Sequence, residues 1–417
     1  MATRVVSLIL LLVAGSAAAE ELSWEQAVRE AGVRNPELTS AMRSLDAAGF
    51  DEKRAEAGYF PELSGQLSYT RSGARPEGAR GTTGNAYGAS LNASQNIFNG
   101  LADKGRVEQA EAAVERSRAS LAEVRARVSL QLKTAFANMR YAQDYQKLAE
   151  QIVGRRRDNL SLVELRFDNG SENKGSVLLS KANYEQAKLE ALQARHALDV
   201  ARTELARVLG RDEPEGLAVR GEVPVEKPSG GGDLKTLALR TPAALQTLSN
   251  EKSAEAGVTV ARSGFFPTLN LTGSTGRSGA EWFPQGDRWS VGLTLSVPLF
   301  SGGSTYYGTK SATSLAEAAS LNTQHTYRDE LKNLRQAYAT YELSAQRLEV
   351  DKAFAEASSV RATIGRQRYN NGLLSFENWD TIESDLINRQ KSLLQSQRER
   401  VTSEAAWEQS QGKGVLE

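Results

Sequence analysis

Gly58-Tyr-Phe-Pro-Glu-Leu63 returns later in the chain as Gly264-Phe-Phe-Pro-Thr-Leu269, at an offset of 206 residues (264 − 58). A second matching pair, Arg166-Phe-Asp-Asn-Gly170 and Arg368-Tyr-Asn-Asn-Gly372, is offset by 202 residues (372 − 170). The difference between the two offsets falls in a loop, where insertions are tolerated. The chain therefore consists of two copies of one unit, which we place at residues 20–209 and 233–417.

Each copy contains two stretches in which apolar and polar residues alternate, the pattern of a strand with one apolar face. Strands are expected at about 62–71, 87–98, 266–277 and 289–300. Each is about ten residues long, which is enough for a tilted strand to cross a bilayer. In the clearest stretch the side chains expected to face lipid are Trp289, Val291, Leu293, Leu295 and Val297.

Long helices are expected after each strand pair. Residues 100–166 and 304–368 contain no proline, and apolar residues recur at steps of three and four, as at Val107, Ala110 and Val114. At 1.5 Å per residue each helix would be about 100 Å long. Shorter helices are expected at 23–57, 173–209, 234–262 and 375–411, with Asn35-Pro36 and Thr241-Pro242 kinking or restarting the two entry helices. The Gly- and Pro-rich segment 210–232 joins the copies.

The first 19 residues predict a secretory signal peptide: Arg4, an apolar run, and small residues before Glu20. The chain has no cysteine, which excludes thiolate metal sites and disulfides, and its formal net charge of zero gives no indication of a nucleic-acid partner. No later stretch approaches the ~20 apolar residues of a transmembrane helix, so membrane entry would require a β-barrel.

The strand count makes oligomerisation necessary for such a barrel. Four strands cannot close, because a barrel needs about eight. A dimer would supply about eight strands and a trimer about twelve. Two alternatives remain for the separate elements: soluble sandwich hairpins for the strands, and an ordinary coiled-coil rod for the helices.

Taken together, these motifs resemble the TolC-type outer-membrane efflux proteins. The resemblance is carried by the repeated Phe-Pro-x-Leu entries into strands, by Pro298-Leu-Phe-Ser-Gly-Gly303, and by the Gly turn late in each repeat. Leu22-Ser-Trp-Glu-Gln-Ala27 with Asn35-Pro36 is similar to the opening helix of the family.

The resemblance implies a mainly α fold with membrane β-structure: a homotrimer whose twelve strands form an outer-membrane β-barrel continuous with a periplasmic α-helical barrel. It implies localisation in the cell outer membrane, with a periplasmic domain. It also implies partners, namely a periplasmic adaptor protein, an inner-membrane pump and outer-membrane lipid. The expected function is a passive exit duct for efflux or type I secretion; the alternative is a periplasm-spanning rod without channel activity.

The resemblance also assigns site residues. The adaptor would dock at two helix–turn–helix tips, which comprise Phe167, Asp168, Asn169, Gly170, Ser171, Tyr369, Asn370, Asn371, Gly372 and Leu373. Acidic residues after the second tip would line a periplasmic aperture, with Glu377, Asp380 and Glu383 as candidates, although the usual aspartate spacing of the family falls on Asn378 and Thr381.

No catalytic, cofactor or metal site is expected. His196 and His325 occupy unmatched positions in the two repeats and have no neighbouring ligand set of the kind that zinc needs. Ser171 and Lys174 match Ser-x-x-Lys, but the companion motifs of that nucleophile are missing. The exported substrate, the pump class and the identity of the adaptor are not encoded in these features.

Overall fold

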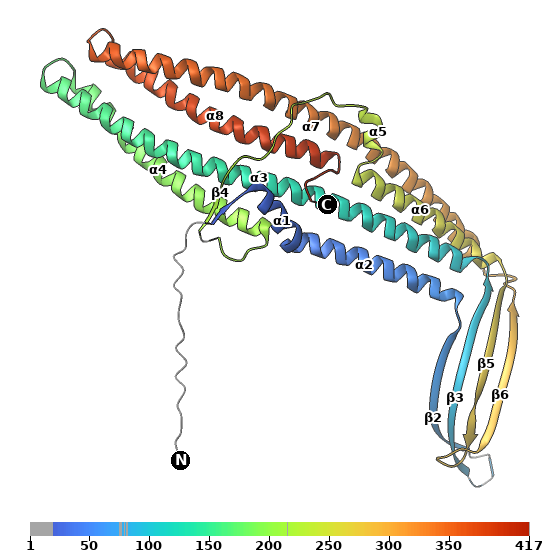
Figure 1. The fold of residues 1–417 in the computed structure, drawn as a ribbon. Helices are drawn as coiled ribbons and strands as arrows, with labels where there is room; N and C mark the ends of the chain where they lie inside the picture. The colour runs from blue at the N-terminus through green and yellow to red at the C-terminus, as the bar shows by residue number, and fades with distance from the viewer. Residues whose placement is uncertain (1–19, 75–76, 79, 81, 215, 417) are drawn as a thin grey trace, which may run out of the picture. The chain divides into compact units, whose positions relative to one another are not determined.

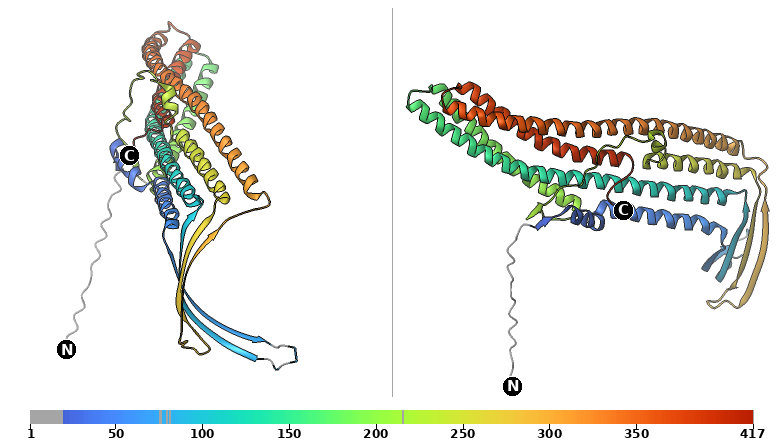
Figure 2. Two further views of the ribbon diagram at one scale, coloured as in Figure 1. Left: turned by 90° about the vertical axis from the view of Figure 1, so that its right-hand side faces the viewer. Right: turned by 45° about the horizontal axis from the view of Figure 1, so that its top comes forward.

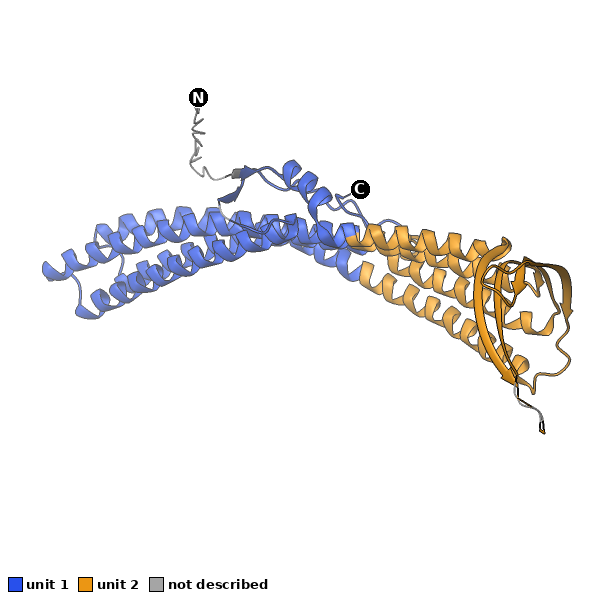
Figure 3. Ribbon diagram, turned by 90° about the horizontal axis from the view of Figure 1, so that it is seen from below, with its two compact units in different colours: residues 1–39, 125–232, 335–417 blue, residues 40–124, 233–334 orange. Residues whose placement is uncertain are grey.

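The computed structural model describes residues 20–74, 77–78, 80, 82–214 and 216–416, so the predicted signal peptide lies outside the described residues. The chain divides into two compact units: unit 1 holds residues from 1–39, 125–232 and 335–417, and unit 2 holds 40–124 and 233–334 (Figure 3). The longest helices, α3 (Ala102–Asp168) and α7 (Ser304–Asn370), contribute to both units. Each unit therefore contains parts of both sequence repeats.

Unit 2 contains a four-stranded antiparallel sheet with one hairpin from each repeat. Its strands are β2 (Glu62–Ala74), β3 (Thr82–Asn99), β5 (Thr268–Gly279) and β6 (Gly286–Ser296). Their order is β2-β3-β5-β6, and β3 pairs with β5 from Tyr87 onward. Figure 1 shows the four strands side by side, and Figure 2 shows the two hairpins separating toward their loops. Within the described residues, β2 and β6 each have one edge without a partner strand.

The strand ends differ from the predicted ones at the loop of the first hairpin and at both ends of β6. The first hairpin continues to the pair Ala74 and Thr82, so its loop is shorter than predicted. Strand β6 begins at Gly286 and ends at Ser296 instead of continuing to about residue 300. Pro298 explains this end, because proline has no N–H to donate to a sheet. Val297, which was predicted to be part of the lipid-facing strand, therefore follows the last strand residue.

A β-bulge lies near the end of β3. The register with β5 shifts between Asn96 and Phe98, so that Phe98 lies opposite Leu269. The extra residue, Ile97, moves Phe98 onto the face that carries the odd-numbered apolar residues of the strands.

Helix packing in unit 2 explains one of the two glycines in the first long helix. A Cβ at Gly105 would lie 2.7 Å from the side chain of Val260 and 3.0 Å from the Ala256 carbonyl oxygen, both in α6 (Pro242–Arg262). Helices α3 and α6 therefore approach closely at this point. An ion pair of 2.7 Å between Lys252 and Glu115 also joins them.

Both entry helices restart at the predicted proline. Helix α1 (Trp24–Arg34) ends at Asn35, whose side chain accepts hydrogen bonds from the backbone N–H groups of Glu37 and Leu38 at the start of α2 (Pro36–Glu56). In the second repeat, a short helix, α5 (Leu234–Ala238), precedes α6, and Thr241 caps α6. Short 3-10 turns at Ala57–Tyr59 and Ser263–Phe265 lead into β2 and β5.

Unit 1 is built on α4 (Lys174–Leu209), α8 (Phe376–Ser410) and parts of α3 and α7. Leu148 and Ile152 of α3, Ala187 of α4 and Ile387 of α8 form one buried cluster. Trp24 of α1 packs edge-on against Phe136 at 5.4 Å between ring centroids. No helix in the described part of the chain has the length and apolar character needed to span a membrane.

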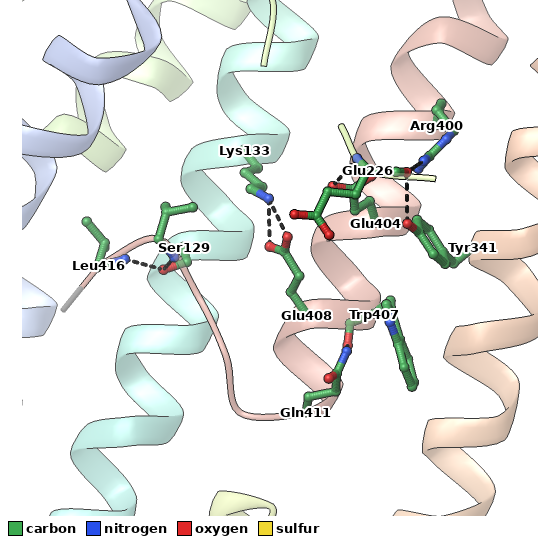
Figure 4. A network of polar contacts seen from close by, with 11 residues as sticks. Ser129, Lys133, Glu226, Tyr341, Arg400, Glu404, Trp407, Glu408, Gln411 and Leu416 are labelled. Carbon is green, nitrogen blue, oxygen red and sulfur yellow. Dashed lines mark hydrogen bonds and ion pairs between the residues drawn. The ribbon is translucent and has the colours of Figure 1, made fainter. Parts of the chain in front are cut away.

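The linker between the repeats, residues 210–232, belongs to unit 1 and contacts other segments of that unit. Strand β4 (Leu217–Val219) pairs in parallel with β1 (Glu20–Leu22). Further on, the Glu226 carbonyl oxygen accepts hydrogen bonds from Tyr341 (2.9 Å) and Arg400, and the Glu226 N–H donates to the Glu404 carboxylate (Figure 4). Nearby, buried Lys133 donates to both oxygens of Glu408 at 2.7 and 2.6 Å.

Candidate functional site

The two helix–turn–helix tips have the same backbone structure. In the first, the N–H of Gly170 donates to the Phe167 carbonyl oxygen, and the N–H of Ser171 donates to that of Arg166. In the second, Gly372 donates to Tyr369, and Leu373 donates to Arg368. Gly170 and Gly372 have φ values of 71° and 73°, the left-handed conformation that ends a helix in this motif.

The side chains at matched positions of the tips have different environments. Phe167 is 41% exposed, whereas Tyr369, its counterpart at an offset of 202 residues, is fully buried. Leu373 is 71% exposed. The other predicted docking residues, Asp168, Asn169, Gly170, Ser171, Asn370, Asn371 and Gly372, are exposed. The structure thus leaves one large apolar side chain exposed in each tip and places Tyr369 in the core.

Tyr369 is the centre of an aromatic stack beneath the tips. Its ring lies parallel to that of Trp379 at 4.2 Å, and the Arg166 guanidinium lies 4.6 Å from its ring centroid. The Arg166 side chain also donates to the Tyr369 carbonyl oxygen at 2.7 Å. Val163 and Phe376 complete the buried cluster.

A residue that sequence analysis did not select, Glu172, connects the two tips. The Tyr369 hydroxyl donates to its carboxylate at 3.0 Å. Burial, with added hydrogen bonding and charge from Glu172, raises the pKa of Tyr369 well above its usual value, so this hydroxyl remains a donor at physiological pH. The contact joins residues 197 positions apart, so no local sequence pattern identifies it.

The three candidate aperture carboxylates differ in exposure. Glu377, in the first turn of α8, is exposed. Asp380 is half-buried and accepts from Arg156 of α3 at 2.8 Å and from Asn183 of α4 at 3.1 Å. Glu383 is buried, and one of its oxygens accepts from Arg366 of α7 at 3.2 Å. Glu377 is therefore the exposed member of the three.

The strand pairing separates the side chains of the sheet onto two faces. The apolar face carries odd-numbered residues of all four strands, including Leu63, Leu67, Tyr69, Tyr87, Leu91, Leu271, Trp289, Val291, Leu293 and Leu295. Most of these side chains are well exposed, from 39% at Leu271 to 87% at Leu67, whereas Tyr87 is half-buried. Four of the five predicted lipid-facing residues lie in β6 on this face; Val297 follows the strand.

The polar face consists mainly of small and hydroxyl-bearing residues. Its members include Ser64, Ser68, Ser90, Asn92, Ser94, Thr272, Ser274, Ser290 and Thr294. Ser274 and Ser290 share a hydrogen bond of 2.8 Å across β5 and β6. A sheet with one apolar and one hydroxyl-rich face, both exposed in a single chain, matches a wall between hydrocarbon and water.

No cluster of three or more metal-ligating side chains exists among the residues that the structure describes. His325 lies 3.5 Å from Asp329 on an exposed helix face.

A family model described as outer membrane efflux protein matches residues 27–211 and 234–413, which cover most of both repeats. Alkaline protease secretion protein AprF of Pseudomonas aeruginosa is 28% identical over 327 residues, covering 75% of this chain and 66% of AprF. Outer membrane protein TolC of Escherichia coli is 26% identical over 332 residues, with the same coverage of 75% and 66%. The matches thus span slightly less than two thirds of the length of these relatives.

The fold is also similar to that of a solved outer-membrane channel. CmeC of Campylobacter jejuni superposes with a TM-score of 0.85 at 18% identity, covering 94% of this chain and 86% of CmeC. At this level of identity the likeness concerns the fold. Together with the family model that matches both repeats, it shows that this chain belongs to the outer membrane efflux protein family, a family of outer-membrane channel proteins.

Proposed function

We propose that the protein is the outer-membrane exit duct of a tripartite efflux or type I secretion system, and that three copies form one passive channel. The observation that carries this proposal is the four-stranded sheet, which has one apolar face, one hydroxyl-rich face and two free edges. Free edges in hydrocarbon would leave backbone groups without hydrogen-bond partners. Pairing β6 of one copy with β2 of the next satisfies both edges, and three copies give a closed ring of twelve strands.

Exposed apolar seams on the helices support the same assembly. On α7, Leu343, Val350 and Ile364 recur at multiples of seven residues and are 69%, 48% and 51% exposed. On α4, Leu178, Leu189 and Leu192 are 58%, 50% and 51% exposed. Residues at heptad spacing lie along one stripe of a helix, and such stripes are buried by a neighbouring helix in coiled-coil packing. Neighbouring copies are the partners that we assign to these seams.

The tips are the proposed docking site for a periplasmic adaptor, which would connect the duct to an inner-membrane pump. Phe167 and Leu373 offer exposed apolar contacts, and the polar residues around them complete the surface. Because Tyr369 is buried, we assign it the role of supporting the second tip from within. The two tips thus have the same backbone structure but expose different side chains, so the adaptor would make different contacts with each tip.

We place the narrowest part of the duct just behind the tips. Three copies of Glu377 and Asp380 would bring carboxylates to one axis, and a ring of one sign attracts cations. Glu383, buried against Arg366, would act by holding α8 to α7 and not by facing the lumen. The duct itself needs no energy source, because the pump would select and drive the cargo.

A rod without channel activity is the competing function. The exposed apolar face of the sheet favours the duct, since a rod that does not enter a membrane gains nothing from it. Reconstitution of the purified mature protein into planar bilayers distinguishes the two. The duct predicts discrete ion-conducting events, whereas folded protein that neither inserts nor conducts would support the rod.

A further inference from the structure

The apolar face of the sheet has a distinct end near the hairpin loops. The helices join the sheet at the other end, since β2 begins shortly after α2 and β3 ends just before α3. Near the hairpin end, Tyr69 and Tyr87 face each other at 4.9 Å between ring centroids, and Trp282 contacts Tyr87 at 5.6 Å. Amphipathic rings of this kind mark the boundary between hydrocarbon and headgroups.

Three charged side chains lie on the apolar face within the described strand residues: Arg71, Arg277 and Asp287. Arg277 and Asp287 neutralise each other in a cross-strand ion pair of 2.8 Å. Arg71 has no carboxylate within ion-pair distance among the residues that the structure describes. It follows Tyr69 on the same face of β2, one pair further toward the loop, and is exposed. Among the described strand residues, Arg71 is therefore the one guanidinium on this face that no carboxylate neutralises.

A second donor lies beside Arg71. Asn85 is its direct partner across β2 and β3. The Tyr69 hydroxyl donates to Asn85 Oδ1 at 3.3 Å. This hydrogen bond uses the oxygen of the Asn85 amide, so its Nδ2 can donate to another group. Directly paired residues on one face have Cβ atoms about 4.5–5.5 Å apart, so a single anionic group can contact both.

We propose that Arg71 and Asn85 bind the phosphate of an anionic glycolipid in the outer leaflet of the outer membrane. This inference rests on the proposed function, which puts the hairpin end outside and the apolar face in lipid. The guanidinium fork matches phosphate oxygens in a bidentate geometry, and the amide supplies a third N–H. The acyl chains of the same molecule would cover Leu67 and Leu91 of the apolar face, and the sugar would lie against Tyr69.

The test is native mass spectrometry of the purified protein titrated with lipid A carrying two phosphates, with dephosphorylated lipid A and with phosphatidylcholine. For the unmodified protein we expect saturable binding of the lipid A with two phosphates, and of neither other lipid. Arg71→Gln should weaken that binding roughly tenfold, since hydrogen bonds to charged groups are among the stronger ones. Arg71→Lys, which retains the charge but loses the fork, should fall between the two.

Arg288→Gln is the matched control, because Arg288 lies near the same end of the sheet but on the polar face. It should bind the lipid as the unmodified protein does. Equal binding by the Arg71→Gln variant and the unmodified protein, or equal weakening by both Gln variants, would overturn the inference, as would displacement of the lipid by millimolar inorganic phosphate. Channel conductance, measured on the same preparations, tests the proposed duct separately. If the protein conducts but the Arg71→Gln variant binds the lipid as tightly as the unmodified protein does, the lipid site is refuted and the duct is not.

Discussion

Phe167 and Tyr369 occupy equal positions in the two repeats but have opposite environments. Phe167 is exposed at its tip, whereas Tyr369 stacks on Trp379 and donates to Glu172. The same aromatic position is therefore part of the surface in the first repeat and part of the core in the second. The hydroxyl that distinguishes tyrosine from phenylalanine is the group that reaches the other tip.

Tyr369→Phe should loosen the tips without unfolding the helices. The change removes one hydrogen bond to a carboxylate, which contributes about 1.5–3 kcal/mol when the acceptor is charged. Glu172 retains contacts with Asn173 and Ser176, so we expect the lower part of that range. Hydrogen exchange of the backbone amides around residues 366–376 should become faster. The matched variant Phe167→Ala, at the exposed position, should leave those amides unchanged; a reversed order would contradict the assigned environments.

Glu404 gives a prediction about pH. Burial raises its pKa above the ordinary 4.5, despite the opposing effects of the Glu226 N–H, Arg400 and Lys133. A carboxyl that binds its proton more tightly in the folded state contributes less stability as pH rises through the raised pKa. Glu404→Gln cannot ionise and retains an acceptor for the Glu226 N–H. Its Tm relative to that of the unmodified protein should therefore rise between about pH 4 and about pH 8. Glu356→Gln, at an exposed position, should show no such trend. If the Tm of Glu404→Gln relative to that of the unmodified protein fell as pH rises, the assigned direction of the pKa shift would be wrong.

At the scale of the elements, alternation along the strands has a direct experimental consequence. Leu293 lies on the apolar face and Thr294 on the polar face. Leu293→Arg would place a charge in the hydrocarbon and should cost about 2–4 kcal/mol, whereas Thr294→Arg would point into the lumen and be tolerated better. Folding yield into lipid vesicles across a urea series measures the difference. Equal damage from both changes would show that the two faces are wrongly assigned.

The elements differ in how far the sequence predicts them. Period-two alternation identifies the strands and their faces, because a shift of register by one residue would move all the apolar side chains of a strand to the opposite face. It does not identify the bulge at Ile97 or the end of β6, which depend on the partner strand and on Pro298. The repeat locates both tips, but burial of Tyr369 and Glu383 results from contacts between distant segments. For that reason Glu172, Arg156 and Arg366 are visible only in the structure.

At the scale of the whole molecule, the proposed aperture predicts ion selectivity. Glu377→Gln combined with Asp380→Asn removes the exposed and half-buried carboxylates while retaining their size, and Asp380→Asn retains an acceptor for Arg156. The double variant should conduct with lower cation selectivity in planar bilayers, because three copies would lose their charge near one axis. Glu356→Gln combined with Glu349→Gln, on the exposed surface of α7, is the control. Unchanged selectivity in the aperture variant would move the constriction elsewhere.

In the proposed assembly, three copies close one barrel through the free edges of β2 and β6. Because the chain contains no cysteine, introduced cysteines can test this pairing without background cross-links. A series of variants would carry one cysteine on the polar face of β2, at Ser64 or Ser68, and one on the polar face of β6, at Ser290 or Thr294. Cysteines on paired strands come within disulfide distance only at matching register. We expect one combination, oxidised in membranes, to yield a covalent trimer on denaturing gels. A ladder that stops at the dimer, or only monomers in all combinations, would contradict it.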